Sequence, residues 1–306
     1  MSSTAASGAD ASSSPSPRGQ GIAFVAAAAL FWSLGGLLAR LVDTDTWTTV
    51  FWRSIFAAIF LLGVTFVQEG RGAWRRTIWG MGWPGVAMAL CFATASTCFI
   101  NALARTTVAN TLIIQSTSPF IAALLGWAWM GERVRRRSWL AMAAALTGAV
   151  VMASHSYGAG SIAGDLLALT TAFAFAAATV IVRRQREIRM TAAAGLAGVF
   201  SAAFAWWPAR PIAVGIDDLA LLALFGAVQL GFGLILFTAG ARLIPVAEAA
   251  LIAVLESVLG PVWVWLALGE TPAAAALLGG AIILVALIAH TALDLRRSAP
   301  SPSLGS

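Results

Sequence analysis

The sequence predicts an all-α integral membrane protein with ten transmembrane helices, built as a five-plus-five inverted repeat with both termini in the cytoplasm. Three observations lead to this fold. Of the 306 residues, 59% are hydrophobic and only 10% are charged, whereas a soluble domain usually carries about 25% charged residues. Long apolar runs recur along the whole chain, and similar motifs recur in its two halves. This composition excludes a water-soluble globular protein.

Ten apolar runs are long enough, at about 20 residues, to cross a bilayer as helices. The Ser-, Ala- and Pro-rich residues 1–19 and residues 295–306 are expected to be disordered tails. The first run is too long for the apolar core of a signal peptide, so it is interpreted as the first helix. The expected spans are 21–41, 48–68, 79–100, 106–130, 138–155, 161–182, 191–208, 217–239, 246–268 and 272–292.

The positions of the arginines predict the orientation. All 19 basic residues are Arg, and with the N-terminus inside, 15 of them lie in cytoplasmic segments. Only Arg40, Arg105 and Arg210 are then outside, while Arg53 lies near the start of a span. This bias follows the positive-inside rule and predicts a multi-pass protein of the inner (plasma) membrane. The arginines lie in short clusters between apolar runs, which indicates membrane-surface anchors and not a nucleic-acid face.

A Trp-x-x-x-Gly-Glu motif occurs twice, at the ends of two apolar runs. The first copy runs from Trp127 to Glu132 and the second from Trp265 to Glu270. Gly is a natural residue just past a helix C-terminus, and a following Glu is favourable beside the N-terminus of the next helix. The motif is therefore interpreted as a duplicated turn that marks a repeat boundary.

Other matches have the same order and nearly the same spacing, which extends the repeat to residues 20–155 and 161–294. Each half holds five spans, an odd number, so the second half must enter the membrane inverted. Inverted repeats are a recurring construction of secondary transporters. The matched segments are Val108-Ala109-Asn110 with Val246-Ala247-Glu248, Ala104-Arg105 with Ala241-Arg242, 55–60 with 199–204, and Gly21 and Arg40 with Gly164 and Arg183.

Three stretches carry a resemblance to a known family: "ALFWSLGGLLAR" in the first span, "LGWAWMGERV" ending the fourth, and "LESVLGPVWVWLALGE" ending the ninth. With the repeat, they resemble the EamA-type permeases of the drug/metabolite transporter superfamily over about residues 20–294. The resemblance implies alternating access and movement of small metabolites or drugs, amino acids or related compounds among them, often outward. Relatives commonly have Glu-Pro where this chain has Glu256-Ser257, so a kink at residue 257 is not carried over.

Ionisable residues inside lipid are costly and are candidate functional groups by default. Glu256 lies in the ninth span, and either binds a cationic group or a proton in a central cavity, or pairs with an Arg to hold helices together. Glu248, near the start of the same span, is a second candidate for ion coupling, although a cytoplasmic-end turn is the simpler interpretation. Arg53 either reaches outward to the membrane interface, or faces inward to bind a carboxylate or phosphate or to pair with a buried Glu.

Uncharged polar residues within the spans complete the candidate cavity. Trp32 and Ser33 interrupt the first span near its middle, where the indole N–H needs a partner. Gln115 and Gln229 are further cavity candidates, with helix–helix hydrogen bonding as the alternative for both. Within the fourth and ninth spans, Pro119 and Pro261 are candidate hinges.

The sequence does not favour an enzyme. The two histidines, His155 and His290, lie at span ends, and no HExxH, GxSxG or P-loop motif occurs. No cofactor and no metal site is expected; the partners expected are a small-molecule substrate, the lipid bilayer, and protons as the candidate coupling ion. The alternatives are a membrane scaffold or sensor without transport, and an intramembrane enzyme. Substrate-dependent flux distinguishes them from a carrier.

Overall fold

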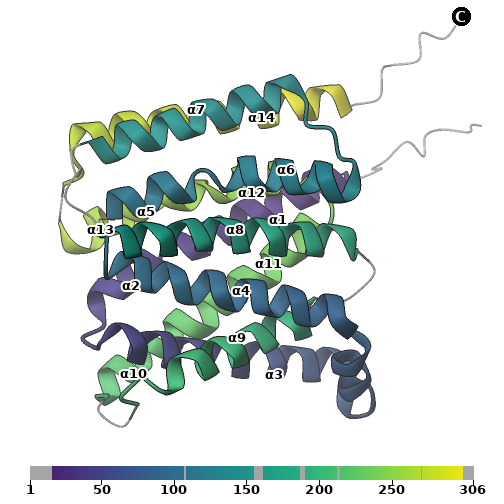
Figure 1. Cartoon of the computed structure of the whole chain (residues 1–306), viewed down its shortest axis with the longest axis vertical. Coiled ribbons are helices and arrows are strands. Elements are labelled where there is room, and N and C mark those ends of the chain that lie inside the picture. The colour runs from purple at the N-terminus through teal and green to yellow at the C-terminus, as the bar shows by residue number, and fades with distance from the viewer. Residues whose placement is uncertain are drawn as a thin grey trace, which may run out of the picture.

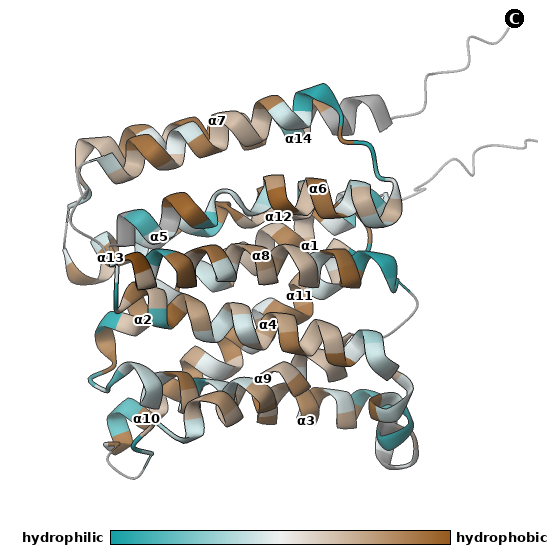
Figure 2. Cartoon of the chain, viewed as in Figure 1, coloured by the Kyte–Doolittle hydropathy of each residue, from teal (hydrophilic) through white to brown (hydrophobic). Residues whose placement is uncertain are grey.

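The structure, a computed structural model, describes residues 16–106, 108–154, 161–186, 190–211, 214–269 and 271–298. All regular secondary structure in these residues is helical. The helices run roughly along one common direction (Figure 1). Hydrophilic residues gather toward the two ends of the bundle, and the lengths between are mostly apolar (Figure 2). This banding is the pattern that a bilayer imposes on helices that cross it.

The helical segments follow the ten predicted spans closely. The first half contains α1 (Pro17–Ser33), α2 (Gly35–Leu41), α3 (Thr46–Gly80), α4 (Gly82–Leu103), α5 (Val108–Gln115), α6 (Ser118–Met130) and α7 (Arg136–Ala153). The second half contains α8 (Ile162–Arg184), α9 (Thr191–Trp206), α10 (Ile216–Ala223), the π-helix η2 (Leu224–Phe232), α11 (Gly233–Ala241), α12 (Val246–Ala253), α13 (Leu255–Leu268) and α14 (Ala274–Ser298).

Among the described residues, eight helical stretches are long and apolar enough to cross a membrane, so the chain is a multi-pass membrane protein. The other two predicted spans correspond to α7, which starts with two arginines, and to the shorter apolar α9. The count of ten crossings and the cytoplasmic termini therefore stay predictions. At the chain ends, α1 begins at Pro17 and α14 continues to Ser298, so both helices reach slightly into the expected tails.

Three of the long spans are interrupted. The first bends at Leu34, between α1 and α2, and the ninth is interrupted at Val254, between α12 and α13. In the fourth span, Ser116 and Thr117 form a turn between α5 and α6. The fourth and ninth interruptions occupy matching positions of the repeat. At Leu34 and Val254 the backbone keeps right-handed helical angles, so the first and ninth interruptions are local changes of the hydrogen-bond pattern and not unwound segments. Secondary transporters commonly form their binding sites at discontinuities in spans.

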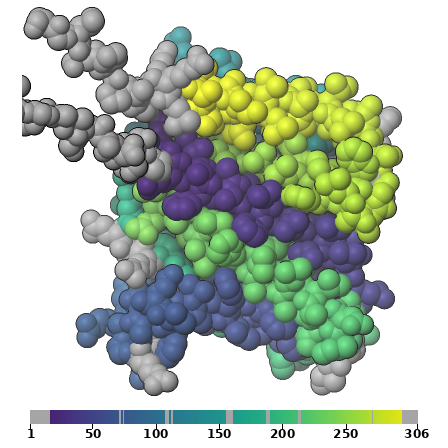
Figure 3. Space-filling model, turned by 180° about the vertical axis from the view of Figure 1, so that it is seen from behind, coloured from purple at the N-terminus to yellow at the C-terminus, as the bar shows by residue number. Residues whose placement is uncertain are grey.

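The two halves interleave and do not form separate bodies. Helix α3 packs on α9, α4 on α8, α7 on α14, α1 on α11, and α6 on α12. From behind, α1 lies between α11 and the α12–α13 segment (Figure 3). The fourth span, α5 to α6, and the ninth, α12 to α13, run in opposite directions (Figure 1). Inverted halves require this arrangement.

Helices α7 and α14 lie together along one edge of the bundle (Figure 1). They approach each other at Gly148 and Gly279, where a Cβ on either residue would collide with the backbone of the other helix. Small residues permit such close helix packing in membranes, where the hydrophobic effect does not drive association.

The helix bundle has two polar ends, which the chain termini distinguish. The start of α1 and the end of α14 lie at one end (Figure 1), here called the terminal end, together with Glu132 and Arg183. The opposite end, with Arg40 and Leu103, is called the mouth end.

Candidate functional site

A cavity of about 660 Å³ lies where the three interrupted spans meet. Its wall includes Ser33 and Gly35 beside the first interruption, Gln115 beside the second, and Ala253 and Val254 at the third. Small-molecule sites in proteins have volumes of roughly 300–1,000 Å³. The size and position both suit a binding site for a small molecule between the two halves.

All six residues predicted to bind substrate line this one cavity: Trp32, Ser33, Arg53, Gln115, Gln229 and Glu256. The hinge candidate Pro261 lines it too, whereas Pro119 and Glu248 do not. α6 begins next to Pro119, directly after the interruption, while α13 continues through Pro261 and the interruption of that span is at Val254. Hinge roles for the two prolines stay predictions.

The cavity extends toward the mouth end. Its lining continues from the interruptions to Arg40 and Leu103, at the ends of α2 and α4, and to Thr271. The residues that join the halves at the terminal end, Glu132 and Arg183 among them, are absent from its lining. The structure is therefore closed toward the terminal end.

Arg53 is buried, with 3% of its surface exposed, and does not extend to the membrane interface. Its Nη2 donates to the hydroxyl and the carbonyl of Ser96 on α4, and its guanidinium lies over the ring of Phe225, 5.0 Å from the centroid. The Nε atom is buried without a hydrogen-bond partner. Arg53 forms no ion pair with a described residue, so its charge is available to an anionic group in the cavity.

The backbone around Arg53 explains how it is held. A Cβ on Gly226 would overlap the Arg53 carbonyl, so only Gly lets η2 approach α3 closely enough to put Phe225 beneath the guanidinium. One residue further along, the Ser54 hydroxyl donates to Ser201 Oγ at 3.0 Å, and Thr97 shares a 2.8 Å bond with that same oxygen. These buried hydroxyls link α3, α4 and α9, which fixes the helix that carries Arg53.

Gln229 projects from η2 to the bend in the first span. Its Nε2 donates a 2.8 Å hydrogen bond to the carbonyl of Trp32, and a Cβ on Gly35 would come within 2.9 Å of that nitrogen. The carbonyl can only accept, so the orientation of the amide is fixed. The Oε1 atom is buried with no partner. Gln229 thus stabilises the bend and also places an unsatisfied acceptor at the cavity wall.

Trp32, Phe92 and Phe175 line the cavity together, and Phe237 packs behind them. The indole lies 5.9 Å from Phe175 and 5.0 Å from Phe237 between ring centroids, and Phe92 is 6.2 Å from Phe175. The buried Trp32 Nε1 has no hydrogen-bond partner. The Trp32 ring therefore both packs against neighbouring aromatic rings and lines the cavity.

Ser33 links the bend to α13. The Trp263 indole N–H donates to Ser33 Oγ at 2.7 Å, and that hydroxyl donates to the Leu30 carbonyl at 2.6 Å. The Ser33 hydroxyl is therefore used by the protein, and its contribution to the site is to fix the shape of the first span.

Glu256 lies in the first turn of α13, where the helix dipole favours a carboxylate. It is half-buried and makes no ion pair or hydrogen bond with a described residue. The pairing with an arginine that the sequence left open is not formed. Gln115 Oε1 is a further buried acceptor without a partner. One cavity thus combines an unpaired guanidinium, an unpaired carboxylate and two unsatisfied amide oxygens.

Comparison with known proteins agrees with this architecture. The sequence profile of the EamA-like transporter family matches residues 19–154 and again 162–291. The chain belongs to the EamA-like transporter family. A solved structure described as "Crystal structure of protein" superposes on this EamA-like transporter with a TM-score of 0.78 and 17% identity, over 91% of this chain and 99% of the other. No curated protein sequence matches it.

Several residues of the site in this EamA-like transporter had no signal in the sequence. Ser96 and Phe225, which hold Arg53, are ordinary residues of apolar spans. Trp263 was one of 13 tryptophans. The unexpected contact of Glu248 is at the terminal end, where its carboxylate pairs with Arg18 at 2.7 Å. The 55–60 and 199–204 match of the repeat was the available hint, since Ser201 lies in one matched segment and Ser54 directly precedes the other.

Proposed function

We propose that this EamA-like transporter is a secondary active carrier that exports small metabolites, amino acids or related compounds, across the inner membrane by alternating access. One observation carries the proposal. Arg53 and Glu256 both line the cavity at the three interrupted spans, and neither forms an ion pair with a described residue. Ionisable groups in lipid are retained where they have a function, because each one is costly.

The cavity suits a compound that has both an acidic and a basic group. Arg53 presents a planar set of donors that matches a carboxylate or phosphate, and its stacking on Phe225 keeps that plane fixed. The Glu256 carboxylate presents an acceptor for an amine. The rings of Trp32 and Phe175 offer an apolar surface to the remainder of the molecule.

Alternating access requires two states in which opposite ends are open. The arginine bias puts the terminal end in the cytoplasm, so this structure corresponds to an outward-facing state. Glu256 is the candidate for proton coupling, because a carboxylate that lacks a partner can carry a proton or a substrate amine through the cycle. The direction of transport and the role of the proton are part of the proposal.

Flux across a membrane tests the proposal directly. Purified protein is reconstituted in liposomes loaded with labelled amino acids, amines, sugars and drugs, and release is followed with and without a pH gradient. We expect protein-dependent release of compounds that carry a carboxylate and an amine. Arg53→Gln and Glu256→Gln should each reduce it by about tenfold or more, as expected when one charged hydrogen bond is lost.

The matched control is Asp217→Asn, which removes one charge from an exposed position at the start of α10, away from the cavity. It should transport like the native protein. If folded protein releases none of the pool above empty liposomes, the carrier proposal fails and a scaffold or sensor becomes the better interpretation. If Glu256→Gln transports normally but no longer responds to pH, Glu256 serves proton coupling and not substrate binding.

A further inference from the structure

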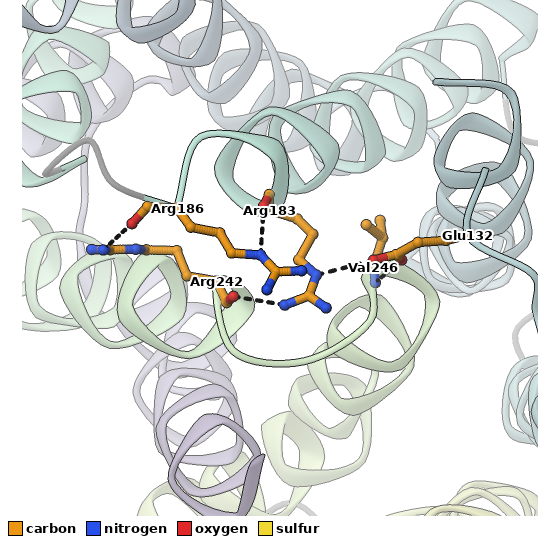
Figure 4. Close-up of polar contacts among 5 residues, drawn as sticks. All are labelled: Glu132, Arg183, Arg186, Arg242 and Val246. Atoms are coloured by element: carbon orange, nitrogen blue, oxygen red, sulfur yellow. Dashed lines mark hydrogen bonds and ion pairs between the residues drawn. The ribbon is translucent and has the colours of Figure 1, made fainter. Parts of the chain in front are cut away.

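One carboxylate joins three helix ends at the terminal end of the bundle. Glu132 Oε1 accepts a 3.1 Å hydrogen bond from Arg183 Nε, and Oε2 accepts a 3.2 Å bond from the Val246 amide. Arg183 Nη1 also donates to the Arg242 carbonyl at 2.7 Å (Figure 4). Glu132 follows α6, Arg183 lies in the last turn of α8 and Val246 begins α12. The contact therefore joins the first half of the repeat to two helices of the second.

The position of Glu132 is fixed by the turn that precedes it. Gly131 has φ of 68°, a left-handed conformation that favours glycine, and its amide donates to the Trp127 carbonyl. The Glu132 amide donates to the Gly126 carbonyl at 3.2 Å. This helix cap aims the carboxylate across the boundary, where it also satisfies an unpaired amide at the start of α12. The duplicated Gly-Glu motif thus has a role beyond ending a helix.

A second ion pair crosses the same boundary. Arg18, at the start of α1, donates to Glu248 Oε2 at 2.7 Å, and Glu248 is buried with 4% of its surface exposed. Glu248 lies two residues beyond Val246 on α12. Both contacts therefore hold the same short helix against elements of the first half.

Helix α12 connects these contacts to the cavity. Val246 and Ala249 are buried, and the next residue, Ala250, already lines the cavity, as does Ala253. A path from the cavity to the terminal end between α12 and the adjacent α6 and α8 must break the hydrogen bond from the Val246 amide to Glu132. It must also break the bond from Arg183 to the Arg242 carbonyl, which precedes α12. Arg183 and Glu132 are 11% and 26% exposed, so salt screens this contact less than a surface pair.

We propose that Glu132 and Arg183 are gating residues of the transport cycle. Their ion pair holds both side chains in place, and their bonds to Val246 and Arg242, with Arg18–Glu248, keep the terminal end closed while the cavity is open toward the mouth end. The bonds to Val246 and Arg242 separate when the cavity opens to the terminal end. This inference rests on the proposed alternating access. In this proposal the gate is formed by Glu132 of the first Gly-Glu motif and by Arg183 in the last turn of α8.

Cysteine accessibility tests the gate without a substrate. In a background with Cys91 and Cys98 replaced by Ala, Ala253→Cys places a single thiol at the cavity wall. The reconstituted protein is labelled by a membrane-impermeant maleimide from each side separately. Glu132→Gln and Arg183→Gln should speed labelling from the terminal side by at least about fivefold, the lower end of a typical coupling between two states, and slow it from the mouth side.

The two variants distinguish the effect of the Glu132–Arg183 ion pair from that of the bond between Glu132 and the Val246 amide. Arg183→Gln removes the pair and leaves the Glu132 carboxylate on the Val246 amide, whereas Glu132→Gln weakens both contacts. We expect the same direction of change in both, larger in Glu132→Gln, and no change in the control Asp217→Asn. A general loss of stability would instead speed labelling from both sides.

The results distinguish the gate from the proposed function. Unchanged labelling of both variants from the terminal side, in protein that transports substrate, overturns the gate and leaves carrier function standing. Opposite shifts at the two sides, in a protein that moves no compound of the pool, support the gate and count against carrier function.

Discussion

The Gln229 side chain donates a 2.8 Å hydrogen bond to the Trp32 carbonyl at the bend of the first span. The two residues come from opposite halves of the repeat, and the bond satisfies a backbone acceptor beside the interruption at Leu34. The Leu34 amide is also directed to this carbonyl, so Gln229 adds a second donor that ties the bend to η2. The first span and the π-helical segment η2 are therefore coupled at the cavity wall.

Replacing Gln229 by Leu should destabilise the protein by about 1 kcal/mol, the usual net contribution of one hydrogen bond, since the Trp32 carbonyl loses its side-chain donor. Glu should have a similar effect when ionised, because a carboxylate cannot donate. Thermal unfolding in detergent measures the change. The matched control is Gln115→Leu, whose Oε1 has no partner to lose. Equal stability of the native and Gln229→Leu proteins would show that the bend does not need the bond.

Arg53→Lys tests whether geometry matters in addition to charge. Lysine keeps the positive charge but loses the planar donor set and the stacking on Phe225. We expect release of carboxylate substrates to fall about tenfold, which corresponds to roughly 1.4 kcal/mol, while neutral compounds are unaffected. Ser96→Ala, which removes only the hydroxyl that accepts from Arg53, should have a smaller effect. Full activity of Arg53→Lys would show that transport needs only a positive charge at this position and not the planar guanidinium.

Asp45 caps α3 and gives the fold a pH dependence outside the spanning segments. Burial tends to raise its pKa, but hydrogen bonds from the Thr48 hydroxyl and from the Thr48 and Trp47 amides, with the charge of Arg210, lower it below the ordinary 3.8. A carboxyl whose pKa is lower in the folded state stabilises the protein above the unfolded pKa. That contribution is lost as pH falls below about 3.8 and through the folded value.

Asp45→Asn separates the cap from the charge. Asn caps a helix about as well as Asp, so stability at neutral pH should change little, while the loss of stability below about pH 3.8 should become smaller. Asp45→Ala should cost about 1 kcal/mol at neutral pH. Unfolding temperatures of the three proteins between pH 3 and 7 check both expectations. If Asp45→Asn loses as much stability at low pH as the native protein, other carboxyl groups cause that loss.

Apolar runs predicted where the helices lie, because the bilayer imposes one length and one composition on every span. Pro119 marked the interruption of the fourth span, whereas the interruptions at Leu34 and Val254 lie in apolar runs without a proline at the break. Nothing in the sequence near Leu34 or Val254 breaks a helix as Pro does, and these breaks depend on partners such as Gln229 and Trp263, which only the fold brings together. The candidate residues were recognisable since polar groups are conspicuous in apolar runs.

The repeat makes a last prediction, about Arg40. Arg40 and Arg183 occupy matching positions of the two halves, as do Glu270 and Glu132, although Glu270 lies outside the described residues. Arg183 closes the terminal end here, and Arg40 lines the cavity toward the mouth end. In an inverted repeat the two halves exchange roles between the two states. We therefore expect Arg40 to help close the mouth end when the terminal end opens.

Arg40→Gln should then favour the mouth-open state. With the single thiol of Ala253→Cys as the reporter, labelling should be faster from the mouth side and slower from the terminal side, the reverse of Glu132→Gln. Combining the two substitutions should bring both rates back toward the native values, since each destabilises the closed form of a different end. If both single variants shift labelling in the same direction, the two ends are not exchanged counterparts, and Arg40 serves as an anchor at the membrane surface.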